Sequence, residues 1–330
     1  MFRNNNTEPI EFDPHGDVEL QVGQGNEANL IIFTVCSRTL ARVSPVFERM
    51  LFGNFKESRP TTKTRDWRVK LPADKVVPLA IFLHICHGQL HRVPNTLPIE
   101  DLYDLTVLTN YYDGTQILGP WVNGWMASIE DDARESQTAL AKAMWIAWEF
   151  GRKELFMRIA HKLLLETEGP LGADDDEFQD LRMPPDIIER IDTIRINTIQ
   201  ALLAIFRDMV ETLIVVDERP RWCRYAEWMG PHRCESMILG SMTFCLARAG
   251  LWPLPNPADV QDSIVGLRRK MASLIIHDIG RASESVDHHE CNPEPYLLDR
   301  VERIIKQMEN PVTEFHYQMM GENAQKLAQS

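Results

Sequence analysis

Cysteine and histidine residues gather in two segments of the second half of the chain, and these residue types can hold a metal ion. The first segment contains Cys223 and Cys234, and the second contains the pair His288 and Cys291, three residues apart. Thiolate sulfur and imidazole nitrogen are ligands that Zn²⁺ prefers, and three cysteines with one histidine fill a tetrahedral shell without an open position. The pattern therefore indicates a structural zinc site formed by these four residues.

The spacing leaves other assignments open. The two segments lack a close Cys-x-x-Cys pair, and residues 235–287 must fold before the site can close. His232 is the alternative ligand for one corner of the tetrahedron, and His289 is the alternative to His288. Without a metal, the same residues would be independent buried thiols and surface histidines. The other cysteines are expected to be core residues: Cys36, Cys86 and Cys245.

The sequence contains no motif that is typical of catalysis. It lacks a Gly-x-Ser-x-Gly elbow, a His-Glu-x-x-His pair, a glycine-rich phosphate loop with lysine, and a His-x-Glu with a paired Cys-x-x-Cys. A nucleophilic Cys–His pair meets only in the folded chain, so the spacing does not test one. We therefore expect a protein that is not an enzyme.

The composition is that of a globular protein. Of the 330 residues, 44% are hydrophobic and 25% are charged, which is enough for about two domains with a core and argues against a disordered chain. The net charge of −13 disfavours a nucleic-acid binder. We find no apolar run long enough for a transmembrane helix and no signal-peptide pattern, so no membrane partner is expected. Six cysteines indicate an intracellular protein of the reducing cytoplasm or nucleus.

Hydrophobic periodicity predicts strands first and helices afterwards. Residues 17–22 alternate polar and apolar side chains, and with 30–35 they predict a β-hairpin. Residues 37–52 predict a helix that breaks and restarts at Ser44-Pro45, because proline is favoured in a first helical turn. Apolar residues that recur about every 3.7 positions predict a long helix after Pro184. Further elements are expected as a strand at 67–71 and helices over 78–87, 99–112, 116–129 and 139–166, the last divided at Gly151.

These elements predict an α+β fold that is predominantly α-helical, with a small mixed sheet flanked by helices and an all-α C-terminal region. The chain divides into five predicted segments: a flexible N-terminal arm at 1–16, a first domain at 17–128, a helical extension at 129–167, an acidic linker at 168–183 and a helical region with the candidate zinc site at 184–330.

The first domain resembles the BTB/POZ domain, in the form found in fungal BTB proteins. The residues that carry the resemblance are 33–47, Met50-Leu51 and 53–58, and the most specific stretch is Ser44-Pro-Val-Phe-x-x-Met-Leu51. The C-terminal region is similar to that of the same proteins, on Cys234-x5-Gly240-Ser241, Gly250-Leu-Trp-Pro253 and His288-x-x-Cys291-Asn-Pro293. This resemblance implies a BTB/POZ fold at 17–128 and strengthens the zinc hypothesis.

The resemblance also implies a protein–protein interaction module. Some BTB domains form homodimers, and others recruit a cullin scaffold for ubiquitin ligation through an apolar-x-Glu motif after the helical hairpin. Phe55-Lys56-Glu57 stands at the matching place, although Phe55 would equally fit the core. Two hypotheses follow: a ligase adaptor whose C-terminal half holds a target, or a self-associating structural or regulatory protein. Either a monomer or a BTB-mediated homodimer is compatible with the sequence.

Overall fold

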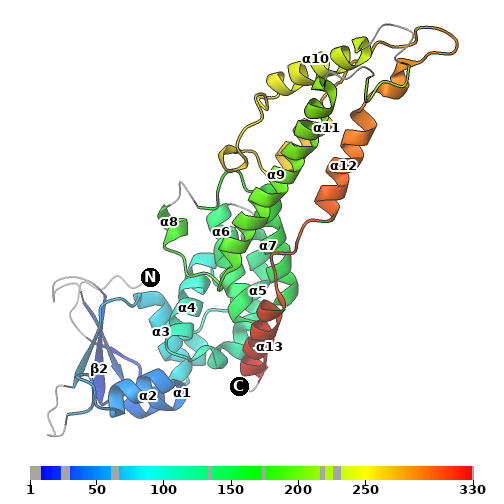
Figure 1. Cartoon of the computed structure of the whole chain (residues 1–330). Helices are drawn as coiled ribbons and strands as arrows, with labels where there is room; N and C mark the ends of the chain where they lie inside the picture. Colours follow the sequence, from blue (N-terminus) through cyan, green and yellow to red (C-terminus); the bar gives the residue numbers. More distant parts are fainter. Residues whose placement is uncertain are drawn as a thin grey trace. The chain divides into compact units, whose positions relative to one another are not determined.

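The chain folds into two compact units in the computed structural model (Figure 1). Unit 1 contains residues 1–159, 177–184 and 312–330, and unit 2 contains residues 160–176 and 185–311. Because the chain leaves unit 1 and later returns to it, the units do not correspond one to one with the five predicted segments. The structure describes residues 9–23, 30–60, 67–132, 136–172, 176–215, 220–225 and 232–328.

The sheet of unit 1 is small and mixed. Strands β2 (Val18–Val22) and β3 (Ile31–Val35) pair antiparallel, with Leu20 opposite Phe33, which confirms the predicted strand pair. Strand β4 (Arg68–Leu71) then lies parallel to β2. Alternate residues of β2 are buried, as the two-residue period of a half-buried strand requires.

A short strand near the N-terminus extends this sheet. Strand β1 (Ile10–Glu11) pairs parallel with β3, so the strand order is β1-β3-β2-β4. Phe12 follows it, is 2% exposed, and packs edge-on against Phe33 with ring centroids 5.1 Å apart. Part of the predicted arm at 1–16 is therefore ordered in the sheet. Two residues are too few to produce a periodic pattern, and residues 1–8 of the arm lie outside the described residues.

A helical hairpin follows β3 as predicted. Ser44 separates its two helices, and the Ser44 hydroxyl accepts a hydrogen bond from the Phe47 backbone N–H at 3.0 Å, which caps the second helix. The Phe47 ring stacks on Tyr112 at 4.2 Å and closes the hairpin over the core. The helices of unit 1 are α1 (Ser37–Val43), α2 (Pro45–Phe52), α3 (Val76–Cys86), α4 (Ile99–Tyr111), α5 (Gly119–Asp132), α6 (Gln137–Glu149), the first half of α7 (Lys153–Glu166), most of α8 (Asp176–Gln179), and α13 (Glu314–Ala328).

Helix α13 joins unit 1 although it follows unit 2 in the sequence. Its His316 lies edge-on to Trp148 of α6, with ring centroids 5.8 Å apart. Gly151 separates α6 from α7 at a φ of +63°, and a Cβ atom at this position would lie 2.5 Å from the carbonyl oxygen of Met320. A glycine is therefore required both for the turn and for the close approach of α13.

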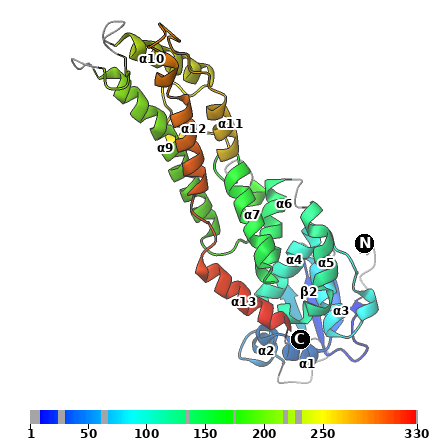
Figure 2. The same ribbon diagram turned by 90° about the vertical axis from the view of Figure 1, so that its right-hand side faces the viewer.

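Unit 2 is built on the long helix α9 (Ile187–Ile214), which confirms the predicted stripe. Helix α12 (Glu294–Lys306) lies beside it (Figure 2), and α10 (Arg233–Arg248) and α11 (Ile264–Ala272) also pack on it. The residues of the predicted stripe are all buried: Ile187, Ile191, Ile194, Thr198, Leu202, Ile205, Met209 and Leu213.

The described chain is thus mostly helical with one small mixed sheet, which confirms the α+β class with predominant helix. No helix in the described residues is long and apolar enough to cross a membrane.

Candidate metal centre

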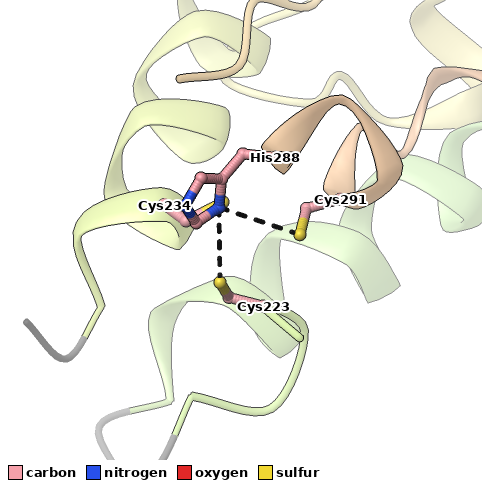
Figure 3. Close-up of side chains that lie close together, drawn as sticks. All are labelled: Cys223, Cys234, His288 and Cys291. Atoms are coloured by element: carbon pink, nitrogen blue, oxygen red, sulfur yellow. Dashed lines mark hydrogen bonds between the residues drawn. The ribbon is translucent and has the colours of Figure 1, made fainter. Parts of the chain in front are cut away.

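Three local elements of unit 2 bring the four predicted ligands together (Figure 3). Cys223 lies in a turn before α10, and Cys234 lies in the first turn of α10. His288 and Cys291 lie at the two ends of the 3₁₀ helix η5 (His288–Cys291). Cys223 and Cys234 form one pair that is close in sequence, and His288 and Cys291 form another. Folding of residues 235–287 brings the two pairs together.

The distances among the ligand atoms suit a single small cation. The Nδ1 atom of His288 lies 3.7 Å from Cys223 Sγ and 4.0 Å from Cys291 Sγ, and the ligand atoms of all four residues lie within 4.8 Å of one another. Tetrahedral Zn²⁺ with ordinary bond lengths places nitrogen and sulfur ligands about 3.6 Å apart. The two distances from His288 to sulfur are therefore close to those of a metal-bound pair.

The environment of the cluster is buried and rich in thiols. Cys234 and Cys291 are 3% and 2% exposed, and His288 is fully buried. Burial raises the pKa of the Cys234 thiol, and the neighbouring Cys223 and Cys291 raise it further. Burial also raises the pKa of Cys223. A bound divalent cation reverses this balance, because it stabilises thiolates that would otherwise repel one another.

The donor set points to a structural metal. Three sulfurs and one nitrogen complete a four-coordinate shell, so no position remains at which water or a substrate could be activated. The cluster Cys223–Cys234–His288–Cys291 could therefore hold a metal ion that cross-links the two segments.

A buried carboxylate, which the sequence analysis missed, holds the turn that carries Cys223. Glu235 is 1% exposed, and its carboxylate accepts hydrogen bonds from the backbone N–H of Trp222 at 2.5 Å and from that of Cys223 at 3.4 Å. The indole N–H of Trp222 in turn donates to the Cys291 carbonyl at 2.6 Å. The only sequence signal for either residue is that each is adjacent to a ligand.

The two alternative histidines lie outside the cluster. His232 Nδ1 is 3.1 Å from Glu235 Oε2. The His289 side chain is 68% exposed, and its Nδ1 is 3.0 Å from a carboxylate oxygen of Asp278. His288 and His289 are neighbours in η5, yet they point in different directions. The structure therefore brings together Cys223, Cys234, His288 and Cys291, and it places neither alternative histidine in the cluster.

The remaining cysteines are separate from this cluster. Cys36, Cys86 and Cys245 are each half-buried and form no disulfide. The Cys245 thiol donates to the carbonyl of Ile275 at 2.9 Å. In the part of the chain that the structure describes, one group of three or more ligating side chains is close enough to share an ion.

The two residues of the predicted partner motif lie after α2 in unit 1. Phe55 is 60% exposed, so it is not part of the core. The Glu57 carbonyl accepts a hydrogen bond from the Trp67 indole at 2.8 Å, and Glu57 lines a pocket of about 450 Å³ between α2, α3 and α4. Apolar side chains supply much of the remaining wall, with Val46, Met50, Leu71, Pro78, Val107 and Leu108. Charged residues also line it, namely Lys70, Asp74, Lys75, Asp104 and Arg182.

Comparisons with protein-family models, curated proteins and solved structures give no significant match to this chain.

Proposed function

We propose that the chain is a non-enzymatic protein–protein interaction protein whose C-terminal unit is stabilised by a structural zinc ion. The observation that carries this proposal is the convergence of Cys223, Cys234, His288 and Cys291 from two distant segments onto one buried point. A full shell of soft ligands supports zinc as the ion and argues for a structural role.

The zinc hypothesis is tested by metal analysis of the purified full-length chain. We expect elemental mass spectrometry to find one zinc ion per chain. After exchange to Co²⁺, we expect the visible absorption of a tetrahedral site and the near-ultraviolet sulfur-to-cobalt bands. Cys234→Ala should lose both signals, whereas Cys245→Ala should keep them. A folded wild-type chain that contains no zinc and takes up no Co²⁺ would overturn the hypothesis.

A second candidate function, the cullin adaptor, is supported by the exposure of Phe55. An exposed aromatic side chain beside a charged residue has the character of an interface hot spot. The adjacent pocket near Glu57 offers a largely apolar surface for a partner side chain. In this proposal the N-terminal unit has a BTB/POZ fold and recruits the scaffold, and unit 2 holds a target.

The adaptor role is tested by a pull-down with the tagged full-length chain, probed for the cullin scaffold. Wild type and Lys56→Ala should recover the scaffold, and Phe55→Ala/Glu57→Ala should not. If none of them recovers it and the chain is a stable dimer by sedimentation, the alternative function as a self-associating protein is favoured instead.

A further inference from the structure

Helix α10 presents an apolar face to solvent on the side opposite to its core contacts. Met237 and Phe244 are 48% and 61% exposed, and Gly240 and Ala247 lie on the same side at helical spacing. Ile275 is 65% exposed and lies beside them, because its carbonyl accepts the Cys245 thiol hydrogen bond. We call these five residues the α10 face. The opposite side of the helix is in the core through Cys234, Ile238, Met242 and Leu246.

The shape of the α10 face suits another helix. A Cβ atom added at Gly240 would have no neighbour within 4 Å, so the middle of the face is open. Met237 and Phe244 stand one turn to either side of this glycine. A second helix could therefore approach the backbone closely at Gly240 while its side chains contact the two large residues. Exposed apolar residues gathered on one face are typical of interaction sites.

Positive charge marks both ends of the α10 face. Arg233 is at the start of the helix and Arg248 at its end, about 22 Å apart at 1.5 Å per residue. Both are exposed, and neither forms an ion pair within the described residues, although the Arg248 guanidinium lies 5.8 Å from the centre of the Phe244 ring. Two uncompensated arginines are notable in a chain with a net charge of −13.

The charges argue against a second copy of α10 as the occupant. An antiparallel copy would place Arg233 against Arg248 at each end, and a parallel copy would place each arginine against itself. Like charges opposed across an interface are unfavourable. We propose that the α10 face binds an amphipathic helix of another protein, whose apolar stripe has Asp or Glu at both ends.

This inference rests on the proposed function, because it names the kind of partner that the C-terminal unit would hold. The metal and the face are linked, since Cys234 lies in the first turn of the same helix. The two proposals fail separately: metal content tests the zinc centre, the Phe55/Glu57 pull-down tests the adaptor role, and helix binding tests the α10 face.

The test uses two synthetic helical probe peptides of about 20 residues, each with a leucine stripe on an alanine-rich background. One peptide has glutamates at both ends of the stripe and the other has lysines. Binding to the full-length chain is measured by fluorescence anisotropy. We expect the glutamate peptide to bind at least about tenfold more tightly, with a preference that weakens as salt is raised.

Three variants make this expectation specific. Phe244→Ser should weaken binding of the glutamate peptide by about tenfold or more, as loss of a central aromatic contact does. Arg233→Glu/Arg248→Glu should reverse the preference, so that the lysine peptide binds better. Arg207→Glu, which changes an exposed arginine of α9 away from the face, should behave as wild type. All of the changed side chains are exposed, so melting curves should be unchanged and show that each variant is folded.

Three results would overturn the proposal. If both peptides bind equally well, the arginines do not select an acidic partner. If neither peptide binds, the α10 face is not a site for a helix. A wild-type dimer in sedimentation that Phe244→Ser dissociates would show that a second copy occupies the face.

Discussion

The carboxylate of Glu235 accepts a hydrogen bond from the backbone N–H of Trp222 at 2.5 Å and so fixes the turn that presents Cys223 to the candidate metal centre. One residue of α10 thus orients a candidate ligand that lies outside the helix, while its neighbour Cys234 is itself a candidate ligand. Buried groups of this kind determine where a ligand atom points before the ion arrives.

Glu235→Gln should therefore weaken zinc binding by about tenfold to a hundredfold, because an amide oxygen is a weaker acceptor for the Trp222 N–H. Competition with a fluorescent zinc chelator measures the change. Glu302→Gln is the matched control, since that carboxylate pairs with Arg268 on the surface and does not contact the site. Equal affinity in both variants would contradict the role given to Glu235.

Cys291→Ala should unfold unit 2 and leave unit 1 folded. A metal held by the four residues would cross-link the segments on either side of 235–287, and removing one ligand from a structural zinc site costs much of the folding free energy that the ion supplies. Hydrogen exchange followed by mass spectrometry should show lost protection in α9 and α12 and retained protection in α3 and α4. Cys245→Ala is the control, and uniform loss in both units would contradict the prediction.

Glu149 should make the stability of unit 1 depend on pH. Burial raises the pKa of its carboxyl to about 7, and the hydrogen bond from Asn110 opposes this only in part. The folded state then binds a proton more tightly than the unfolded state, whose pKa is near 4.5. The free energy of unfolding should therefore fall by up to about 3 kcal/mol as the pH rises from 4.5 to 7.

Glu149→Gln should remove this pH dependence, because glutamine keeps the oxygen that accepts from Asn110 and carries no charge. Urea unfolding monitored by hydrogen exchange in α6, at pH 5 and pH 8, measures the effect. The variant should be the more stable protein at pH 8. Glu11→Gln, at an exposed glutamate of β1, should keep the slope of the wild type. A wild-type unfolding free energy that does not change between pH 5 and pH 8 would contradict the prediction.

Gly151→Ala should loosen α13 from unit 1. The new methyl group would meet the Met320 carbonyl oxygen at 2.5 Å, in addition to the cost of a positive φ. We expect the free energy of unfolding to fall by about 2 to 4 kcal/mol and hydrogen exchange in α13 to become faster. Gly88→Ala isolates the cost of the positive φ, because Gly88 has a φ of +72° and nothing within 4 Å of an added Cβ atom. That variant should lose only about 1 kcal/mol of unfolding free energy, and the difference between the two variants measures the steric part.

The sequence predicts the regular elements well where a local pattern exists. The alternation in β2, the helix break at Ser44-Pro45 and the apolar stripe of α9 each follow from a local sequence pattern. Strand β1 has only two residues and no such pattern. The return of α13 to Trp148 could not be predicted, because contacts between residues so far apart leave no local periodicity.

The candidate site shows the same limit. Ligand chemistry selects three cysteines and a histidine, but it does not distinguish His288 from its neighbour His289. That choice depends on the backbone of η5, which buries one ring and turns the other toward Asp278. Glu235 is an ordinary surface-type residue in sequence, and only its burial against the Trp222 turn shows its role.

The position of α13 also has a consequence for synthesis on the ribosome. Residues 312–328 are made after all of unit 2, yet they cover Trp148 and Gly151 of unit 1. The sheet and the first helices can form early, but this side of unit 1 stays uncovered until translation has passed residue 320. During that interval the nascent chain exposes apolar surface that a chaperone could bind.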